Sequence, residues 1–359
     1  DTGAGLWKLA GNPTFSETGD PGGGTISGRL DLNGATRTFT VGNSLGADTV
    51  VDLDVPAVLS GAAGNGLTKA GTGTLRLGGA NTFDGPVNIT GTLRISHPQG
   101  LGVPSASRAL TVNASSSLVL DGANGDISLP ADFAVSLNGG GNTLLGPVSG
   151  AIVNASGTNT VAGAATLAGA TTLASLAGRL TLSGDITGNN TLTVQGDGDM
   201  VLAGARGGTS TLTKNGAGTL TLTGASGFTG AVTLYAGVMN VRNNTALGTV
   251  AGGVTTYIGS ELQLQNDVTI GAETLSLRGT GLSNGGALRN ISGTNTYGGK
   301  ITLGMTDVRI NSDAGKLILD VATGNGIAGN TFNVRFGGAG DIEVADPIAT
   351  TTGMLTKDG

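Results

Sequence analysis

The sequence predicts an all-β protein, a right-handed parallel β-helix in which short strands coil into stacked turns. Two observations support this prediction. One long motif returns later in the chain in the same phase, and the segments between Gly- and Asn-rich turns alternate apolar with polar residues. Alternation with a period of two is typical of strands that bury one face. The repeat matters because each copy must bury its apolar face against its neighbours.

The repeated motif occupies residues 66–102 and returns at residues 211–248. Its Leu-Thr-Lys start occurs a third time close to the last residue of the sequence. The three lysines of this start, Lys69, Lys214 and Lys357, are 145 and then 143 positions apart. A spacing this regular indicates that the whole chain, and not only the motif, is built from repeated units.

Alternation inside the motif separates residues expected in the core from residues expected on the surface. The expected core positions carry Leu, Ile or Val: Leu75, Leu77, Leu93, Ile95, Leu220, Leu222, Val232, Leu234 and Val241. The expected surface positions carry Arg or Thr: Arg76, Arg94, Thr221 and Thr233. A slip of the register by one residue would exchange the two sets, so the prediction is strict.

The repeat divides the chain into segments of one continuous solenoid. Residues 1–24 are irregular and are interpreted as an N-terminal segment or cap. Residues 25–65 end a first repeat unit, and two whole units follow at residues 66–210 and 211–353. Residues 354–359 start a further unit, so the sequence is interpreted as a slice of a longer array.

Consecutive strands without helices fit either an antiparallel sandwich or barrel, or a parallel coil. The coil is favoured because its corners can be short and rich in Gly and Asn, as they are here. Thr and Asn also recur at matching positions, where stacked turns pair such residues in ladders. Residues 162–177 are the only helix candidate, and their glycines and threonines disfavour a helix. Parallel crossovers are nearly always right-handed, which predicts the hand of the coil.

Composition narrows the class of protein further. Gly accounts for 68 of 359 residues without any Gly-X-Y period, which excludes collagen. Only 12% of residues are charged but 38% are hydrophobic, which favours an ordered chain over a disordered one. A net charge of −6 offers no basic surface, so nucleic acid is not an expected partner. The absence of Cys excludes disulfide scaffolds and thiol catalysis.

Both copies of the motif share the pattern L-T-K-x-G-x-G-T-L-x-L-x-G-A-N-x-[FY]-x-G, with a further short strand after it. The pattern occurs at residues 67–85 with 91–95 and at residues 212–230 with 237–241. It resembles the passenger-associated transport repeat, also called the autotransporter-associated β-strand repeat. The second copy departs from the first where Ser226-Gly227 replaces Asn81-Thr82 and where Met239 stands at the place of Leu93, and neither change affects the expected fold.

This resemblance implies a right-handed parallel β-helix that is exported and displayed, extracellularly, at the surface of a bacterium. Proteins of this family usually reach the surface through an outer-membrane barrel. An outer-membrane translocator is therefore a partner that only the resemblance implies.

Few residues suggest chemistry. His97 is the only histidine, and one turn histidine does not indicate a catalytic triad or a histidine metal site. Paired carboxylates are better candidates, because such a pair can act as acid and base on a glycoside or hold Ca²⁺. Three pairs precede the Leu-Thr-Lys starts: Asp52 with Asp54, Asp197 with Asp199, and Asp341 with Glu343. Their recurrence favours a structural role, because an active site is usually built once, and cation binding by a pair stays open.

Glycine-rich segments match two ligand-binding motifs only in part. Residues 337–341 follow the order of a calcium-binding nonapeptide, but they occur once and place the Asp one position early. Gly71 with Gly73, and Gly216 with Gly218, are not followed by a helix whose N-terminus would hold phosphate. The sequence therefore predicts no catalytic, cofactor-binding or metal-binding residues.

The sequence predicts a non-enzymatic structural rod of the bacterial cell surface: a stalk, fibre or filament of stacked turns. Its expected partners are further turns of the same chain or copies of itself, and monomer and filament both stay open. The first alternative is an adhesin or carbohydrate-binding passenger that contacts host or surface glycans or proteins through loops such as residues 1–24. The second alternative is a polysaccharide-active β-helix enzyme.

Overall fold

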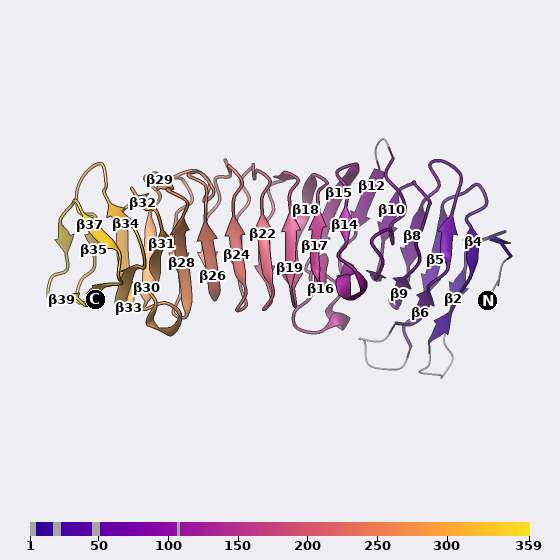
Figure 1. The fold of residues 1–359 in the computed structure, drawn as a ribbon, viewed down its shortest axis with the longest axis horizontal. Helices are drawn as coiled ribbons and strands as arrows, with labels where there is room; N and C mark the ends of the chain where they lie inside the picture. The colour runs from indigo at the N-terminus through magenta and orange to yellow at the C-terminus, as the bar shows by residue number, and fades with distance from the viewer. Residues whose placement is uncertain (1–4, 17–22, 45–50, 106–107) are drawn as a thin grey trace. The chain divides into compact units, whose positions relative to one another are not determined.

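In the computed structural model of this chain, β-strands make up nearly all of the regular secondary structure (Figure 1). It describes residues 5–16, 23–44, 51–105 and 108–359. Short 3-10 turns interrupt the described strands: η1 Gly122–Asn124, η2 Thr143–Leu145 and η3 Leu282–Asn284. Within these ranges no helix is long and apolar enough to cross a membrane. The chain divides into two compact units, the N-terminal unit Asp1–Asp185 and the C-terminal unit Ile186–Gly359.

The strands of the N-terminal unit are short. They are β1 (Trp7–Lys8), β2 (Thr14–Phe15), β3 (Gly24–Thr25), β4 (Arg29–Asp31), β5 (Arg37–Val41), β6 (Leu53–Val55), β7 (Val58–Ser60), β8 (Leu67–Ala70), β9 (Thr74–Leu77), β10 (Val87–Ile89), β11 (Thr92–Ile95), β12 (Arg108–Val112), β13 (Ser117–Asp121), β14 (Ser128–Leu129), β15 (Phe133–Gly139), β16 (Ile152–Ser156), β17 (Thr158–Val161), β18 (Ala165–Ser175) and β19 (Arg179–Leu182).

These strands pair in parallel from one turn of the chain to the next and form columns. One column runs β5–β8–β10–β12–β15–β18, and a second runs β6–β9–β11–β13–β16–β18. Shorter columns, β1–β4–β7 and β14–β17–β19, close the remaining side. The helix candidate at residues 162–177 contains β18, whose first half pairs with β15 and whose second half pairs with β16. Its alternation of small apolar residues and Thr thus belongs to a strand, as its composition predicts.

The strands of the C-terminal unit repeat this arrangement. They are β20 (Ile186–Thr187), β21 (Leu192–Gln195), β22 (Asp199–Leu202), β23 (Leu212–Lys214), β24 (Thr219–Leu222), β25 (Val232–Leu234), β26 (Gly237–Val241), β27 (Val254–Thr256), β28 (Ser260–Gln265), β29 (Thr269–Ile270), β30 (Leu275–Gly279), β31 (Leu288–Ser292), β32 (Thr294–Tyr297), β33 (Ile301–Ser312), β34 (Lys316–Leu319), β35 (Ile327–Ala328), β36 (Val334–Gly337), β37 (Asp341–Val344), β38 (Ile348–Ala349) and β39 (Leu355–Lys357).

The columns of this unit have the same order as those of the first. They run β21–β23–β25–β27–β30–β33, β22–β24–β26–β28–β31–β33 and β29–β32–β34–β37. The long strand β33 joins two columns, as β18 does in the N-terminal unit. The fold class is therefore a parallel β-solenoid, and this prediction is confirmed.

The core of each unit consists of the inward side chains of stacked strands. The residues expected inside are at most 3% exposed: Leu75, Leu77, Leu93, Ile95, Leu220, Leu222, Val232, Leu234 and Val241. The residues expected outside are half-exposed: Arg76, Arg94, Thr221 and Thr233. The predicted register is confirmed, and leucines of successive turns lie directly above one another, as Leu75 does with Leu93.

The glycines of the Leu-Thr-Lys-x-Gly start are required by the corner that follows the strand. Gly71 and Gly216 have φ angles of +82° and +77°, a region that side chains with a Cβ disfavour. A Cβ on Gly71 would lie 2.4 Å from the carbonyl oxygen of Val41, which belongs to a neighbouring turn. The corner is therefore closed by backbone packed directly on backbone.

The irregular segment expected at residues 1–24 is described in part. Its strands β1, β2 and β3 pair in parallel with β4, β5 and β6. Residues 1–4 and 17–22 lie outside the described residues, so a capping role for this segment stays a prediction. The repeat boundaries at 66–210 and 211–353 describe the phase of the sequence and stay a prediction as well.

Exchange of an inward and an outward residue for Asp tests the core. Leu222→Asp places an unpaired charge between stacked turns and should lower the free energy of unfolding by more than about 4 kcal/mol. The neighbouring Thr221→Asp faces water and should lower it by less than about 1 kcal/mol. Urea unfolding followed by circular dichroism measures both variants. Equal losses would contradict the assignment of Leu222 to the core.

Candidate functional site

Two of the three lysines that mark the phase of the repeat, Lys69 and Lys214, lie inside the solenoid, whereas Lys357 is exposed. Lys69 in β8 is 0% exposed, and Lys214 at the end of β23 is 2% exposed. The Nζ of Lys214 donates hydrogen bonds to the carbonyl oxygens of Asn215 and Gly216, both at 2.7 Å, and of Ala236 at 3.4 Å. These carbonyls belong to corners, where the N–H groups of a paired strand are not available as donors. The lysine therefore supplies hydrogen bonds that the corner carbonyls need.

Lys69 repeats this arrangement in the N-terminal unit. Its Nζ donates to the carbonyl oxygens of Ala70 at 2.9 Å, Gly71 at 2.7 Å and Thr90 at 3.3 Å. The sequence identified the lysines only as markers of the period. Their alternation with Leu and Thr already indicates an inward direction, because Lys69 lies two residues after the buried Leu67.

Burial shifts the titration of both lysines. Desolvation lowers the pKa of Lys69 to about 8, and the charge of Asp52 opposes this shift. Desolvation also lowers the pKa of Lys214 to about 8, against the opposing charges of Asp197 and Asp199. An amine with a lowered pKa can act as a nucleophile or base. Here each amine is enclosed and bonded to backbone, so the arrangement serves the corner and not a substrate.

A second internal arrangement comes from the Ser-Gly-Thr-Asn-Thr segments at residues 156–160 and 292–296. In the N-terminal unit, Asn159 accepts a hydrogen bond from the backbone N–H of Ile127 at 2.7 Å and donates to Asn154 Oδ1 at 2.5 Å. Asn154 in turn donates to the carbonyl oxygen of Ala177 at 2.6 Å. Both amides are fully buried and link three successive passages of the chain.

The C-terminal unit contains the same amide pair. Asn295 accepts from the backbone N–H of Val268 at 2.7 Å and donates to Asn290 Oδ1. Asn290 donates to the carbonyl oxygen of Ala314 at 2.9 Å. The sequence already showed that the two segments match residue for residue. It did not show that the two asparagines of each pair contact each other, because this contact depends on the corners between β16 and β17 and between β31 and β32.

The carboxylates of the first predicted pair have separate partners. Asp52 is buried and accepts hydrogen bonds from the backbone N–H groups of Ser44 at 2.7 Å and Thr74 at 2.5 Å. Asp54 forms an ion pair with Arg76 at 2.5 Å. Each carboxylate therefore supports a neighbouring turn, and the two do not share a ligand in this structure.

The other two pairs also contact neighbouring turns. Asp199 accepts from the backbone N–H of Thr219 at 3.0 Å, and Asp197 accepts weakly from that of Ala217 at 3.4 Å. Glu343 forms an ion pair with Lys316. Among the described residues, no three of His, Cys, Asp and Glu gather closely enough to hold a metal ion.

The remaining sequence candidates also have local structural roles. The Nδ1 of His97 accepts a hydrogen bond from the backbone N–H of Gln99 at 3.0 Å within a turn. Gly338, inside the nonapeptide-like segment, has a φ of +96° and packs against the carbonyl oxygen of Ser312. The backbone N–H of Asp341 donates to Gly315 in the preceding turn at 2.8 Å. These contacts place the segment in the stacking of the solenoid.

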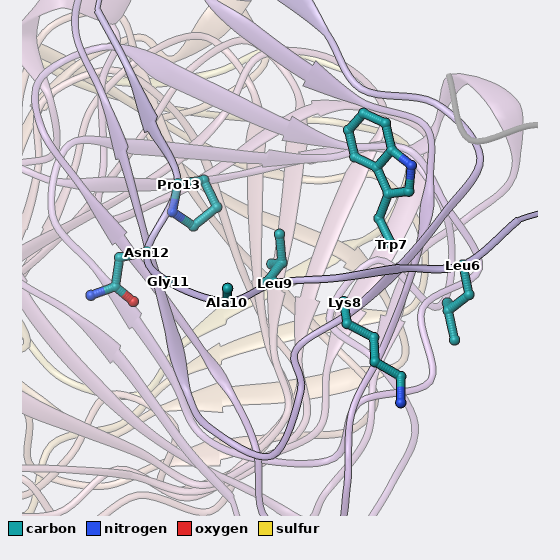
Figure 2. A pocket seen from close by; sticks show the side chains of 8 residues that line it. All are labelled: Leu6, Trp7, Lys8, Leu9, Ala10, Gly11, Asn12 and Pro13. Carbon is teal, nitrogen blue, oxygen red and sulfur yellow. The ribbon is translucent and has the colours of Figure 1, made fainter.

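A cavity of about 530 Å³ lies at the first described strand, and Figure 2 shows its lining residues. All of them come from one stretch, Leu6 to Pro13. The side chains of Trp7 and Lys8 point in opposite directions along this strand and do not converge on a common point (Figure 2). Trp7 is 55% exposed. The cavity is thus an open flank of a strand and offers no set of convergent polar groups.

Repeated parallel turns with repeated internal lysine and asparagine contacts define the class of this protein: a β-solenoid repeat protein. Comparison with known proteins indicates which β-solenoid repeat proteins this chain resembles. The model of the passenger-associated transport repeat matches residues 67–95 and 212–241. The Adhesin BmaC autotransporter of Brucella suis biovar 1 (strain 1330) is 32% identical over 149 residues, which is 38% of this chain and 4% of that protein. No solved structure matches.

These matches show a chain that carries passenger-associated transport repeats and is similar to a bacterial autotransporter, and this relationship indicates export to the bacterial cell surface. The predicted family and location are thus confirmed. The chain spans only 4% of the length of the relative it matches, so the activity and partners of the whole protein are matters for proposal.

Because Lys69 and Lys214 are buried, we expect the free energy of unfolding to depend on pH in the alkaline range. Their folded-state pKa of about 8 lies below the ordinary value of 10.5. Between these values the unfolded chain binds more protons, so the free energy of unfolding should rise with pH. Urea unfolding from about pH 7.5 to about pH 9.5 measures this rise. Burial raises the pKa of Tyr297, so at higher pH the ionisation of this tyrosine in the unfolded chain would lower the free energy of unfolding, and the chosen range stays below that effect.

The double variant Lys69→Met with Lys214→Met should lose this rise, because Met has no proton to release. The exposed Lys300→Met provides the matched control and should keep it. A flat profile in the parent chain, or an unchanged rise in the double variant, would contradict the role of the two buried amines.

The amide pair predicts a localised loss of stability. Asn295→Leu leaves the N–H of Val268 and the Oδ1 of Asn290 buried without partners, which should cost about 3 kcal/mol. The adjacent half-buried Thr296→Val should cost less than about 1 kcal/mol. Urea unfolding of both variants measures the difference, and a small effect of Asn295→Leu would show that the pair is dispensable.

Proposed function

We propose that this chain is a non-enzymatic structural segment of a surface-exposed passenger, a rod that carries other parts of its protein away from the cell. The observation that supports this proposal is the repetition of two internal polar arrangements in both units. The buried lysine and the asparagine pair each occur once in both units. Catalytic sites are normally built once, whereas contacts that hold a scaffold are needed in every repeat.

The proposed mechanism is mechanical. Strands within a column have backbone partners on both sides, so a turn can be displaced only by breaking hydrogen bonds along its whole length. In such arrays each repeat contacts its neighbours alone, and the stability of the array grows with the number of repeats. The proposed partners are further turns of the same chain or copies of it, together with the outer-membrane translocator that the family implies.

One observation favours a second candidate function, adhesion. The relative from Brucella suis is named an adhesin, and an adhesin needs a surface that contacts a ligand. The enzyme alternative has less support, because the paired carboxylates contact separate groups of neighbouring turns.

A deletion in phase with the repeat tests the structural proposal. Removal of residues 70–214 joins Lys69 to Asn215 and restores the sequence of one motif start. The shortened chain should fold, because every inward position keeps its neighbour. With turns of about 20–25 residues and about 4.8 Å between strands, small-angle scattering should show a longest dimension shorter by roughly 30 Å.

Removal of residues 70–204 is the matched control. This deletion differs by ten residues and breaks the phase, so it should unfold or aggregate. An in-phase variant that unfolds, or that keeps the longest dimension of the parent, would contradict a rod of interchangeable units.

A further inference from the structure

One corner of the C-terminal unit carries an aligned row of large side chains. The row begins with Tyr235, which follows β25, and continues with Tyr257, which follows β27. Strand register places them in neighbouring turns, because Leu234 pairs with Thr256. The same register places Arg278 of β30 next to Tyr257, because Thr255 pairs with Ser276. We call Tyr235, Tyr257 and Arg278 the tyrosine strip.

The side chains of the tyrosine strip stack on one another at the surface. The rings of Tyr235 and Tyr257 have centroids 4.6 Å apart and planes inclined by 28°. The guanidinium carbon of Arg278 lies 4.6 Å from the centroid of Tyr257. Tyr235 is 46% exposed, and the adjacent Ile258 is 65% exposed. The strip therefore presents an aromatic surface with a cation at one end.

The charge of Arg278 has no ion-pair partner among the described residues. Its Nε is buried without a hydrogen-bond acceptor. The backbone at Gly304 closes the next turn against it, since a Cβ there would lie 3.0 Å from this Nε. The terminal Nη1 and Nη2 groups of Arg278, unlike the buried Nε, can therefore donate to an external anion.

The fold does not require this strip. In the N-terminal unit the equivalent corner carries Thr90, Asn113 and Asn138, because Ile89 pairs with Val112 and Val112 pairs with Leu137. These small polar residues close the same corner without aromatic or charged groups. Two tyrosines and an arginine at the matching places are thus additions to the scaffold.

A groove continues the strip along the same outer face. Its volume is about 330 Å³, and Thr255, Ser276 and Thr302 are among its lining residues. Thr255 lies two positions before Tyr257, and Ser276 two positions before Arg278, so the period of two places them on the same side. Hydroxyl groups, which both donate and accept hydrogen bonds, therefore border the aromatic surface.

We propose that the tyrosine strip and its groove bind a saccharide chain that carries carboxylate groups. Tyrosine rings offer an apolar body and a polar tip, which suits the C–H face and the hydroxyls of a sugar. The guanidinium of Arg278 can hold a carboxylate in a bidentate pair. No Asp or Glu is part of the strip. The carboxylate of Glu273, beside the groove, is buried and accepts a hydrogen bond from the backbone N–H of Gly253 at 2.8 Å, so it is directed at the protein and not at a ligand.

A saccharide fits this surface better than a peptide. An extended peptide that binds by adding a strand needs an open sheet edge. The strands that carry the strip have partners on both sides, since β27 pairs with both β25 and β30. This inference goes beyond the structural role proposed above and does not depend on it, because a rod can be mechanically sound with or without a binding strip.

Calorimetric titration of the full chain tests the proposal. The probes are hyaluronan oligosaccharides and oligogalacturonates, two acidic chains from different sources, and neutral maltooligosaccharides. At least one acidic probe should bind measurably more tightly than the neutral one, and the acidic probe that binds identifies the source of the ligand. No binding of either acidic probe, or equal binding of the neutral probe, would overturn the proposal.

The variants Tyr235→Thr, Tyr257→Asn and Arg278→Asn introduce the residues of the equivalent corner, which the solenoid already accommodates. Arg278→Asn should weaken binding of the acidic probe by about tenfold or more, because it removes a charge-assisted contact. Each tyrosine variant should weaken it by a smaller factor. Thr90→Ala, at the matching place of the N-terminal unit, is the control and should leave binding unchanged.

Sedimentation of the same proteins without ligand separates saccharide binding from self-association. Parent and triple variant should sediment alike and melt at similar temperatures. Acidic probes that bind the triple variant as tightly as the parent would overturn the proposal. It would also be overturned if the parent alone self-associated without ligand, since the strip would then be a contact between copies of the chain.

Discussion

The structure depends on stacking in register: each inward side chain must lie over the inward side chain of the turn before it. In the N-terminal unit Leu75, Leu93 and Leu118 form such a row. Backbone hydrogen bonds join the same strands, so a turn cannot shift without breaking both sets of contacts. This constraint explains the restricted set of core residues. Leu, Val and Ile can stack on copies of themselves at the strand spacing, whereas larger side chains demand a matched space in the next turn.

Corners create the second requirement, because there the chain leaves the strand pattern and its carbonyl groups lose regular partners. Lys214 and the pair Asn290 with Asn295 supply donors at these points from inside the solenoid. Burying an amine is unfavourable, as its lowered pKa shows. The alternative, a set of buried carbonyls without donors, is also unfavourable, and the lysine satisfies three of them at once. This balance accounts for a lysine at a core position of both motifs.

The outer faces of the two units have diverged although the scaffold is shared. In the N-terminal unit one face carries an apolar cluster under a loop: Val119, Val153 and Ala174, with Leu145 and Val148 packed against them. The matching face of the C-terminal unit carries a charged group instead, in which Arg289 contacts Glu261 and Asp313. The tyrosine strip follows the same rule, since it occupies places that small polar residues fill in the other unit. Function in such a fold resides in outward residues, which the stacking does not restrict.

The sequence by itself determined the strands, their inward and outward faces and the repeat, because alternation with a period of two is a local property that Leu75 and Arg76 display directly. It also indicated the family through the two motif copies. Only the tertiary structure decided which residues of different turns meet. Tyr235 and Tyr257 are 22 positions apart, and Lys69 reaches Thr90 across 21. The number of residues in each corner determines which residues of neighbouring turns are in contact. Because the corners vary in length, the sequence has no periodic pattern that predicts these contacts.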